Sequence, residues 1–309
     1  MQVTAAMVKE LREMTGAGMS ACKNALTEAN GDIKRASEIL REKGLAAAAK
    51  KAGRIAAEGL VAAAISDDRK RGAIVEVNSE TDFVAKNEDF VNFVKQVAQQ
   101  VLSSGAETPD VLLAEKWAPD PSQTVQDVFT QKVAIIGENI GLRRFSRYEV
   151  GDGEAVVEYI HGGGRVGVML KITASTITDA IIEAGRNVCM QIAAMSPQFV
   201  ARENVPEEYI NSETDFLTKT ALKENEEADK PKPANIIEGM VKGRLAKQLK
   251  EICLLDQEYV KDGDLTVGAY LKTVGADVKV SRFTRYEKGE GIEKKEEDFA
   301  AEVAKAMNV

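Results

Sequence analysis

The sequence predicts an α+β protein that carries a separate helical bundle at its start. Two observations in the 309 residues support this prediction. Apolar residues in segment 1–54 recur at helical spacing, with glycine-containing turns between the periodic stretches. Further along, RFSRYEVGDG at 144–153 is repeated as RFTRYEKGEG at 282–291, and each copy follows an alternation of apolar and polar residues that is typical of a strand. The repeat predicts a duplicated α+β core with antiparallel sheets.

Residues 1–54 are predicted to form a three-helix bundle of the UBA-like kind, which ends in a helical, basic linker at 45–54. Asp32 is placed to cap the third helix, and Lys43-Gly44 is expected to end it. A bundle of this size buries only a small core and is typical of a docking module. The apolar stripes are Val3, Met7, Val8, Leu11 and Met14, then Met19, Cys22, Ala25 and Leu26, then Ile33, Ala36, Ile39 and Leu40.

The core is predicted to consist of two halves, each built from a β-hairpin, a helix and a further strand. Segment 58–78 aligns with 153–173 at a constant separation of 95 residues, and both segments have the pattern of a hairpin. At the same separation, 88–100 aligns with 183–195, and both show an amphipathic helical pattern. Each half is therefore expected to place one helix on a face of antiparallel strands.

A helical hairpin is predicted to interrupt the second half. The separation between repeated residues grows from 95 to 138, which predicts an insertion of 43 residues between about 198 and 255. Two helical patterns flank KPKP at 230–233, so the insert at about 200–252 is expected to be an antiparallel coiled-coil hairpin. The predicted domains are 1–54, 55–153, 154–291 and a C-terminal helical module at 292–309.

The hexapeptide NSETDF occurs twice, at 78–83 and at 211–216, in two different settings. The first copy closes a predicted strand and precedes a helix that is expected to start near Asn87. Thr81 or Asp82 is therefore placed to cap a turn. The second copy lies inside the insertion, so the two copies are not equivalent positions of the duplication.

Phe83 has two interpretations from the pattern: a core side chain at the junction of loop and helix, or an exposed contact. At the separation of 95, Phe83 falls on Thr178, so this half-fold does not require an aromatic residue there. That comparison favours an exposed anchor for a partner. In the second copy, Phe216 is expected to enter the seam of the hairpin beside Tyr209 and Leu222.

Composition and reactive residues disfavour several classes of function. The net charge of −8 argues against a dedicated nucleic-acid binder, although residues 1–54 carry ten Lys and Arg against six Asp and Glu. The cysteines Cys22, Cys189 and Cys253 lie far apart, which disfavours a zinc site or disulfides and fits a reducing cytoplasm. His161 is the only histidine, and the adjoining GGGRVG lacks the ending of a phosphate loop. No apolar run reaches the roughly 18 residues of a membrane span, and no cofactor is expected.

Five segments together resemble the elongation factor Ts family. They are 11–44 with TGAGM, 76–87 with SETDFVA, 136–145 with IGENIGLRRF, 161–168 with HGGGRVGV and 250–262 with KEICLLDQEYVKD. The resemblance runs in order along essentially the whole chain. It implies a guanine-nucleotide exchange factor, not an enzyme, that promotes GDP release from the GTPase elongation factor Tu. It also implies the helical module, the two-part core, the inserted hairpin and the C-terminal helix.

The resemblance also assigns partner-binding residues. Thr81, Asp82, Phe83 and Val84 match the segment that disturbs the Mg²⁺ and phosphate site of the GTPase, with Phe83 as the inserted wedge. Further matches are Ile136 and Gly137 near the phosphate-binding loop, and Leu11, Met19 and Lys23 in N-terminal docking. The helix EEDFAAEVAKAM at 296–307 is expected to pack near that docking site. The second NSETDF departs from the family pattern.

Three alternatives remain beside this interpretation. The three-helix module alone also fits a ubiquitin-type adaptor, although an adaptor would not explain the SETDFVA segment. An enzyme or metal site that uses Glu80 and Asp82 has weaker support, because no further ligand-spaced residues lie nearby. A homodimer through the second core half or the hairpin stays open. No direct nucleic-acid or membrane partner is expected.

Overall fold

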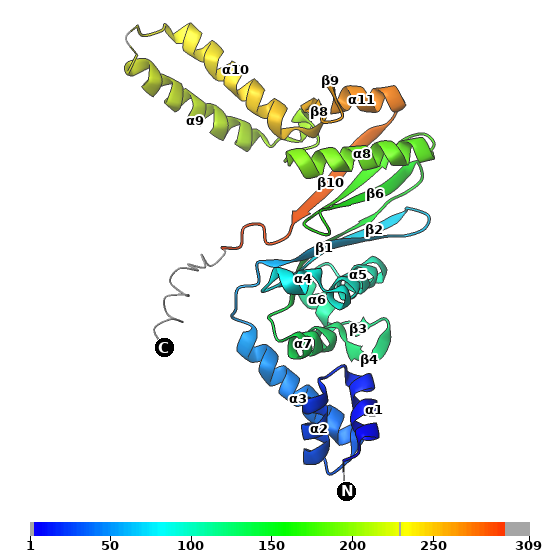
Figure 1. Cartoon of the computed structure of the whole chain (residues 1–309). Helices are drawn as coiled ribbons and strands as arrows, with labels where there is room; N and C mark the ends of the chain where they lie inside the picture. The colour runs from blue at the N-terminus through cyan, green and yellow to red at the C-terminus, as the bar shows by residue number, and fades with distance from the viewer. Residues whose placement is uncertain (1–2, 229, 294–309) are drawn as a thin grey trace.

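The computed structural model describes residues 3–228 and 230–293, and it is elongated (Figure 1). A helical bundle lies at one end, two sheets lie in the middle, and a helical hairpin projects from the other end. Helices combined with antiparallel sheets confirm the predicted α+β class. The predicted helix at 296–307, and nearly all of the module at 292–309, lie outside the described residues.

The N-terminal bundle consists of three helices around a small aliphatic core. The helices are α1 (Ala5–Thr15), α2 (Met19–Glu28) and α3 (Ile33–Lys51). The Asp32 side chain accepts a hydrogen bond from the Arg35 N–H and caps α3, as predicted. The predicted end at Lys43-Gly44 is wrong, because α3 continues through this glycine. Gly44 is buried, and a Cβ there would lie 3.4 Å from Ala134 Cβ, so the glycine allows α3 to pack closely against the core.

The first half of the core is a three-stranded antiparallel sheet, in the order β1-β2-β5, with its helices on one face (Figure 1). Its strands and helices are β1 (Glu58–Ile65), β2 (Arg71–Ser79), α4 (Asp82–Lys86), α5 (Glu88–Ser103), α6 (Pro109–Ala114), β3 (Lys116–Trp117), β4 (Asp120–Thr124), α7 (Val125–Ile136) and β5 (Gly141–Glu149). Helix α5 packs on the sheet through an aliphatic and aromatic face that includes Phe90, Phe93 and Val97.

The second half repeats this plan with a sheet in the order β10-β7-β6. Its strands and helices are β6 (Glu154–His161), β7 (Val166–Thr173), α8 (Asp179–Met195), β8 (Glu258–Tyr259), β9 (Asp262–Thr266), α11 (Val267–Val274) and β10 (Lys279–Glu287). Short 3-10 turns occur at Arg202–Asn204 and Leu254–Asp256. His161 is the last residue of β6, and its Nδ1 lies 2.9 Å from the Tyr159 hydroxyl at an exposed turn. The duplicated β-hairpins and third strands are confirmed.

The two sheets face each other, and corresponding residues meet across the interface. A Cβ on Gly72 would lie 2.5 Å from Val156 Cγ1, and a Cβ on Gly167 would lie 2.4 Å from Val61 Cγ1. Gly72 and Gly167 are 95 residues apart in the sequence, and so are Val61 and Val156. Each half therefore contributes an equivalent glycine and an equivalent valine to the interface. The glycines let the sheets approach closely, and the duplication therefore forms an internal two-fold arrangement.

The repeated RFSRYE and RFTRYE motifs also bind one another. Each copy places a tyrosine hydroxyl against a hydroxyl of the other copy and an arginine over the other tyrosine ring. The distances are 2.7 Å from Ser146 Oγ to Tyr286 OH, 2.8 Å from Tyr148 OH to Thr284 Oγ1, 4.2 Å from the Arg144 guanidinium to the Tyr286 ring and 4.7 Å from the Arg282 guanidinium to the Tyr148 ring. The motif is thus part of the contact between the halves.

Equivalent residues of the core helices α5 and α8 are 91 positions apart in the sequence. The predicted alignment of these two helices at a separation of 95 is therefore wrong. Gln100 of α5 and Gln191 of α8 are both buried, and each binds the backbone of the short hairpin in its own half. Their partners are Lys116 O and Ala118 N for Gln100, and Glu258 O and Val260 N for Gln191. A helix repeats its faces about every 3.6 residues, so a shift of four residues leaves the hydrophobic pattern almost unchanged.

The inserted hairpin consists of α9 (Glu207–Glu226) and α10 (Ala234–Ile252), which pack against each other (Figure 1). Equivalent residues of the two halves are 91 positions apart in the core helices and 142 positions apart in the short hairpins, where Tyr259 corresponds to Trp117. Between these two elements the second half therefore contains 51 residues more than the first, and not the predicted 43. The seam of the inserted hairpin contains Leu217, Ala221, Ile237 and Val241.

Two side chains of the second NSETDF helix do not enter this seam. Phe216 is 64% exposed and Leu222 is 47% exposed, so the prediction that both lie in the seam is wrong. The helix turns their neighbours Leu217 and Ala221 inward instead. Tyr209 is partly buried near the base of the hairpin, where its ring packs against Phe199.

Candidate functional site

The first NSETDF segment ends strand β2 and begins the five-residue helix α4. Thr81 is the N-cap, and its Oγ1 accepts a hydrogen bond from the Val84 N–H at 3.4 Å. Asn87 ends α4 and caps α5 through its side chain. The capping role is therefore confirmed for Thr81, whereas Asp82 and Phe83 occupy the first turn of α4 rather than a loop.

Phe83 projects from this short helix into solvent and is 82% exposed. Of the two interpretations of Phe83, a core side chain or an exposed one, the structure shows the exposed one. Its neighbour Val84 is partly buried against the hydrophobic core of the first half, and Ala85 is buried. The core side of α4 thus fixes the helix while Phe83 points away. A large aromatic side chain presented in this way has the character of an anchor for a partner protein.

Phe83 has no counterpart in the second half of the core. Eight residues (80–87) lie between Ser79, the last residue of β2, and α5, whereas only four (175–178) lie between Ala174, the residue equivalent to Ser79, and α8. The predicted match of Phe83 with Thr178 is therefore wrong: Thr178 is the N-cap of α8 and corresponds to Asn87, the N-cap of α5. The four additional residues form most of α4.

The Glu138 carboxylate binds the start of α4 from across the fold. It accepts hydrogen bonds from the Thr81 hydroxyl at 2.6 Å and from the backbone N–H groups of Glu80 and Thr81 at 3.0 Å each. In return, Glu80 Oε1 accepts the Asn139 N–H at 2.6 Å and lies 3.5 Å from the Arg54 guanidinium. We call this reciprocal set of contacts the carboxylate clamp.

The end of α7 lies beside α4 and completes the site. Gly137 ends α7 with a φ of 86°, a backbone conformation that favours glycine, and its N–H bonds to Val133 O. Ile136 is partly buried against the core, whereas Ile135 is exposed. Helix α7 has 12 residues and its counterpart α11 has 8, so this last turn is also specific to the first half.

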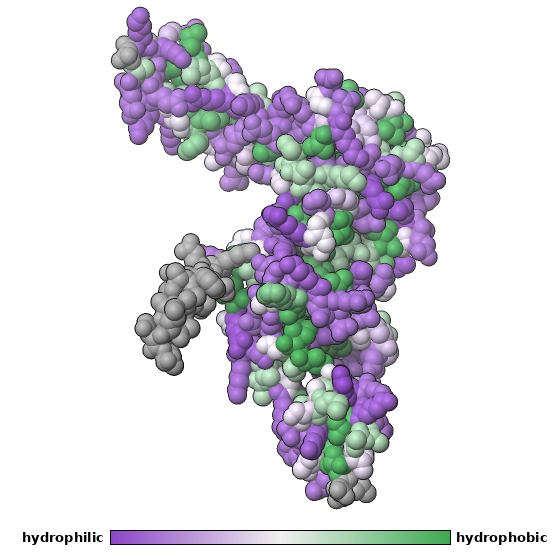
Figure 2. Space-filling model, viewed as in Figure 1, coloured by the Kyte–Doolittle hydropathy of each residue, from purple (hydrophilic) through white to green (hydrophobic). Residues whose placement is uncertain are grey.

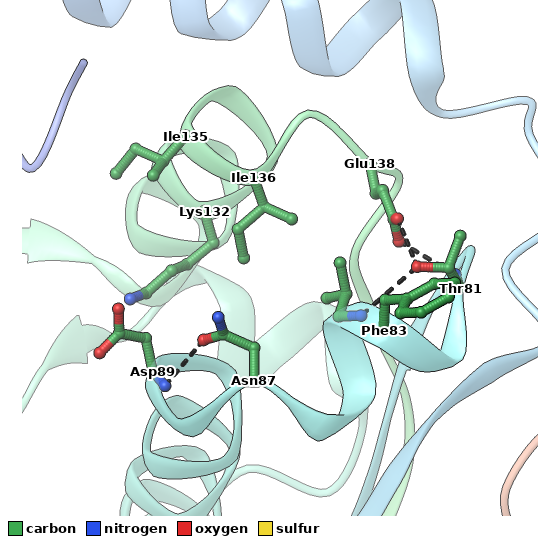
Figure 3. A pocket seen from close by; sticks show the side chains of 9 residues that line it. Thr81, Phe83, Asn87, Asp89, Lys132, Ile135, Ile136 and Glu138 are labelled. Carbon is green, nitrogen blue, oxygen red and sulfur yellow. Dashed lines mark hydrogen bonds between the residues drawn. The ribbon is translucent and has the colours of Figure 1, made fainter.

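A hollow of about 550 Å³ lies between α4 and α7 (Figure 3). Figure 3 shows Glu138 bonded to Thr81 on one side and the two isoleucines and Lys132 on the other. Its lining combines apolar side chains with the charged side chains of Asp89, Lys132 and Glu138. The lining residues are Thr81, Phe83, Val84, Asn87, Asp89, Lys132, Ile135, Ile136 and Glu138.

Asp82 is bound within its own helix. Lys86 donates a hydrogen bond to Asp82 Oδ2 at 2.6 Å and thereby lowers the pKa of the Asp82 carboxyl. Glu80 points to Asn139 instead, so the two carboxylates have separate partners and do not form an acid–base pair. Within residues 3–228 and 230–293, no group of three or more His, Cys, Asp and Glu side chains is arranged to hold a metal.

The N-terminal bundle adjoins the same site. Gly16, in the turn between α1 and α2, would place a Cβ 3.1 Å from Ile135 Cδ1. At the start of α2, Met19 is 57% exposed, and Lys23 is exposed one turn later. Leu11 is fully buried in the bundle, so it is unavailable for direct contact and instead supports the helices that carry Met19 and Lys23. Figure 2 shows apolar surface gathered over the first core half and the bundle.

Comparison with known proteins decides the family. A family model described as "Elongation factor TS" matches residues 80–290, more than half of the chain. The chain belongs to the elongation factor Ts family. Elongation factor Ts of Clostridium perfringens strain 13 is 52% identical over 307 residues, which cover 98% of each chain. Those of Clostridioides difficile strain 630 and Clostridium botulinum strain Langeland are 52% and 49% identical, with 99% of each chain covered.

Membership of the elongation factor Ts family places the chain among the elongation factors of protein biosynthesis. The predicted family is thus confirmed. Among the described helices, none combines the length and the apolar character required to cross a membrane.

Three residues of this elongation factor Ts site were missed from the sequence alone. Glu138 stands in the motif IGEN, but its bond to Thr81 spans 57 residues and gives no local pattern. Ile135 and Lys132 look like ordinary positions of an amphipathic helix. The signal that could have found them is the additional turn of α7, which becomes visible only when the two halves are aligned in space.

Proposed function

We propose that this chain is a guanine-nucleotide exchange factor that binds elongation factor Tu·GDP and promotes release of GDP, thereby supporting translation elongation. The observation that carries the proposal is Phe83, an aromatic side chain 82% exposed on a helix that tertiary hydrogen bonds hold in place. Family membership supports the choice of partner and of activity. We propose the cytoplasm as the compartment, since the three cysteines are all free and buried.

The proposed mechanism is linkage and requires no covalent chemistry. A protein that binds the nucleotide-free GTPase more tightly than the GDP form must weaken GDP binding by the same factor. In such GTPases, Mg²⁺ bridges the phosphate oxygens to protein groups. Disturbance of that end of the nucleotide site removes strong charge interactions, and it is therefore the most effective place to act.

The α4 segment is the proposed wedge. Phe83 inserts between side chains of the GTPase, and Val84 supports it from the core side. Thr81 fixes the start of the helix, and Asp82 brings a negative charge toward the Mg²⁺ region. A carboxylate there competes for the metal and repels the phosphates. Its low pKa keeps Asp82 ionised at neutral pH.

Two further surfaces complete the proposed interface. Ile136 and Gly137, at the end of α7, act near the phosphate-binding loop of the GTPase. Met19 and Lys23 dock the N-terminal bundle on the same partner, with Leu11 as internal support. The turn at Gly16 lies against Ile135, so the bundle and α7 present one continuous surface. A second copy of this chain, bound through the second core half or the hairpin, would appear in the molar mass of the free protein in solution.

Phe83→Ala and Phe216→Ala provide a matched test, because both residues end an NSETDF hexapeptide and both are exposed. We expect Phe83→Ala to slow GDP release by roughly 30-fold, the effect of losing a central anchor. Phe216→Ala should change the rate by less than about twofold, as is usual for a surface substitution. Release of fluorescent GDP from elongation factor Tu, followed by stopped flow, measures both. Equal losses in the two variants would contradict the proposed wedge.

A further inference from the structure

We infer that Glu138 is a positioning residue, which holds the first turn of α4 in the orientation that presents Phe83. The inference rests on the proposed exchange function and assigns Glu138 no contact with the partner. Glu138 lies 57 residues from Thr81 in the sequence, immediately after Gly137. It therefore links the two segments that are proposed to meet the GTPase.

Helix α4 needs such support because five residues do not form a stable helix alone. Helix nucleation is unfavourable, and short helices depend on tertiary contacts. Within α4, the Thr81 cap supplies one bond and the Asp82–Lys86 pair another. Both side chains of that pair are substantially exposed, so it contributes little stability. Val84 and Ala85 anchor the core-facing side of the helix, and the residues just before Asp82 lie outside this contact.

Glu138 supplies what the helix lacks. Its Oε2 accepts the N–H groups of Glu80 and Thr81, and its Oε1 accepts the Thr81 hydroxyl. Because the Thr81 hydroxyl proton points to Glu138, the lone pairs of the same oxygen face the Val84 N–H. The clamp thus orients the cap as well as the backbone just before Asp82.

The return contact couples this turn to the end of α7. Glu80 Oε1 accepts the Asn139 N–H, and the Asn139 side chain donates to Arg54 O at 2.8 Å. Segments 80–81 and 138–139 therefore hold one another through backbone groups in both directions. A displacement of α4 relative to Ile136 would break several charge-assisted bonds at once.

The second half of the core contains a reduced form of the same contact. There the Asp277 carboxylate accepts the Ser175 N–H at 2.7 Å and is also bound by the Ser175 side chain. Ser175 corresponds to Glu80, and Asp277 corresponds to Asn139. This connection contains no helix equivalent to α4, so Asp277 has no helix start to hold. Asp277→Asn is therefore the matched control for Glu138→Gln.

Amide hydrogen exchange of the free protein tests the clamp without any partner. In Glu138→Gln, the charge of the clamp is lost, and the new NH2 group faces the Thr81 hydroxyl, which must then accept instead of donate. We expect the Glu80 and Thr81 amides to exchange roughly tenfold faster, as suits the loss of hydrogen bonds to a charged group. Thr81→Ser retains the hydroxyl and should keep the protection, whereas Asp277→Asn should affect the Ser175 amide alone. Unchanged protection of Glu80 and Thr81 in Glu138→Gln would overturn the inference.

A double-mutant cycle then tests whether Glu138 acts through Phe83. We expect Glu138→Gln to lower the maximal rate of GDP release by roughly threefold to tenfold, with a smaller change in the half-saturating concentration. The double variant with Phe83→Ala should be no slower than Phe83→Ala alone. Additive losses, or a loss that follows the melting temperature, would show a general structural role and overturn the inference. Thr81→Val provides a second variant if Glu138→Gln folds poorly.

The outcomes separate this inference from the proposed function. If Phe83→Ala slows GDP release and Glu138→Gln does not, the positioning role fails and the exchange function stands. If the unaltered protein does not accelerate GDP release at all, the exchange function fails, and amide exchange of the free protein alone decides whether Glu138 holds the start of α4. Faster amide exchange in Glu138→Gln, together with non-additive effects of Glu138→Gln and Phe83→Ala on GDP release, supports both the positioning role and the exchange function.

Discussion

The two halves of the core share one frame, yet only the first half carries the exposed Phe83 and the α4 helix that presents it. Sheets, core helices and short hairpins correspond, and their residues meet reciprocally across the molecule. The first half differs by four additional residues before α5 and by four additional residues in α7. One addition presents Phe83, and the other presents Ile136 and Gly137. The comparison shows that the candidate site lies on the two short segments by which the halves differ.

Neither extension disturbs the buried face of a core helix. Asn87 has extended backbone between the added residues and α5, so α5 keeps its own phase. The residues added to α7 form its last turn and follow its buried positions, which end at Val133. The buried positions of α5 and α8 correspond at a separation of 91. Both extensions therefore leave the buried faces of α5 and α7 in place.

Replacement of the eight-residue connection 80–87 by the four residues of 175–178 should have the largest effect. This change converts the first half to the plan of the second and removes α4 with Phe83. We expect acceleration of GDP release to fall by roughly 100-fold or more, since a whole cluster of anchor contacts is lost. The melting temperature should fall much less, because the second half shows that the frame closes with the shorter connection. Stopped-flow GDP release and thermal melting measure the two effects.

The reciprocal exchange is the control for that replacement. Insertion of residues 80–87 in place of 175–178 should leave GDP release unchanged, because the second half has no clamp partner equivalent to Glu138 and only Asp277 at the matching place. Collapse of the fold in the first replacement, seen as a loss of cooperative melting, would contradict the view that the two connections are interchangeable.

Gly72→Ala and Gly167→Ala should have intermediate and similar effects on stability. Each added methyl would meet a valine of the other sheet at 2.5 Å or 2.4 Å, so the sheets must separate. We expect each substitution to reduce the free energy of unfolding by about 1 to 3 kcal/mol, the usual cost of overpacking. Chemical denaturation measures both values. A large effect at one glycine and none at the other would show that the interface is not symmetric in energy.

Much of this comparison could be predicted from the sequence. The repeated RFSRYE and RFTRYE motifs, and the constant separation of 95 between 58–78 and 153–173, predicted the two hairpins and the further strand of each half. Strand register is predictable because a shift of one residue exchanges the two faces of a sheet. The exposure of Phe83 was also predicted correctly, although its supposed match with Thr178 was not the right reason.

Helix register and tertiary hydrogen bonds could not be predicted in the same way. A shift of four residues hardly changes an amphipathic pattern, so the additional turns before α5 and in α7 were invisible. Phe216 shows the same limit, because its helical stripe did not distinguish the seam from the adjoining surface. The bond between Glu138 and Thr81 depends on the packing of the whole first half.

Lys86→Met should have the smallest effect of these changes, and it tests what the charge of Lys86 contributes to the α4 extension. Lys86 lowers the pKa of Asp82 by a hydrogen bond, so its loss should raise that pKa toward the ordinary value. A lowered folded-state pKa stabilises the protein above the unfolded pKa, and this contribution disappears as the pH falls through the folded pKa. It is therefore fully present at neutral pH and is lost only in acid.

Titration of the Asp82 carboxyl by carbon-13 NMR measures the shift directly. The pKa of Glu154, which Lys171 lowers in the second half, should stay unchanged in Lys86→Met and serves as the internal control. Since Asp82 remains ionised with or without Lys86 between about pH 6 and 8, GDP release should keep the same pH profile in both proteins over that range. Lys86 stays protonated over this range, because Asp82 raises its pKa. A rate that fell equally at every pH in Lys86→Met would therefore mean that Lys86 itself contacts the partner, and the extension would then act through a cation as well as through Phe83.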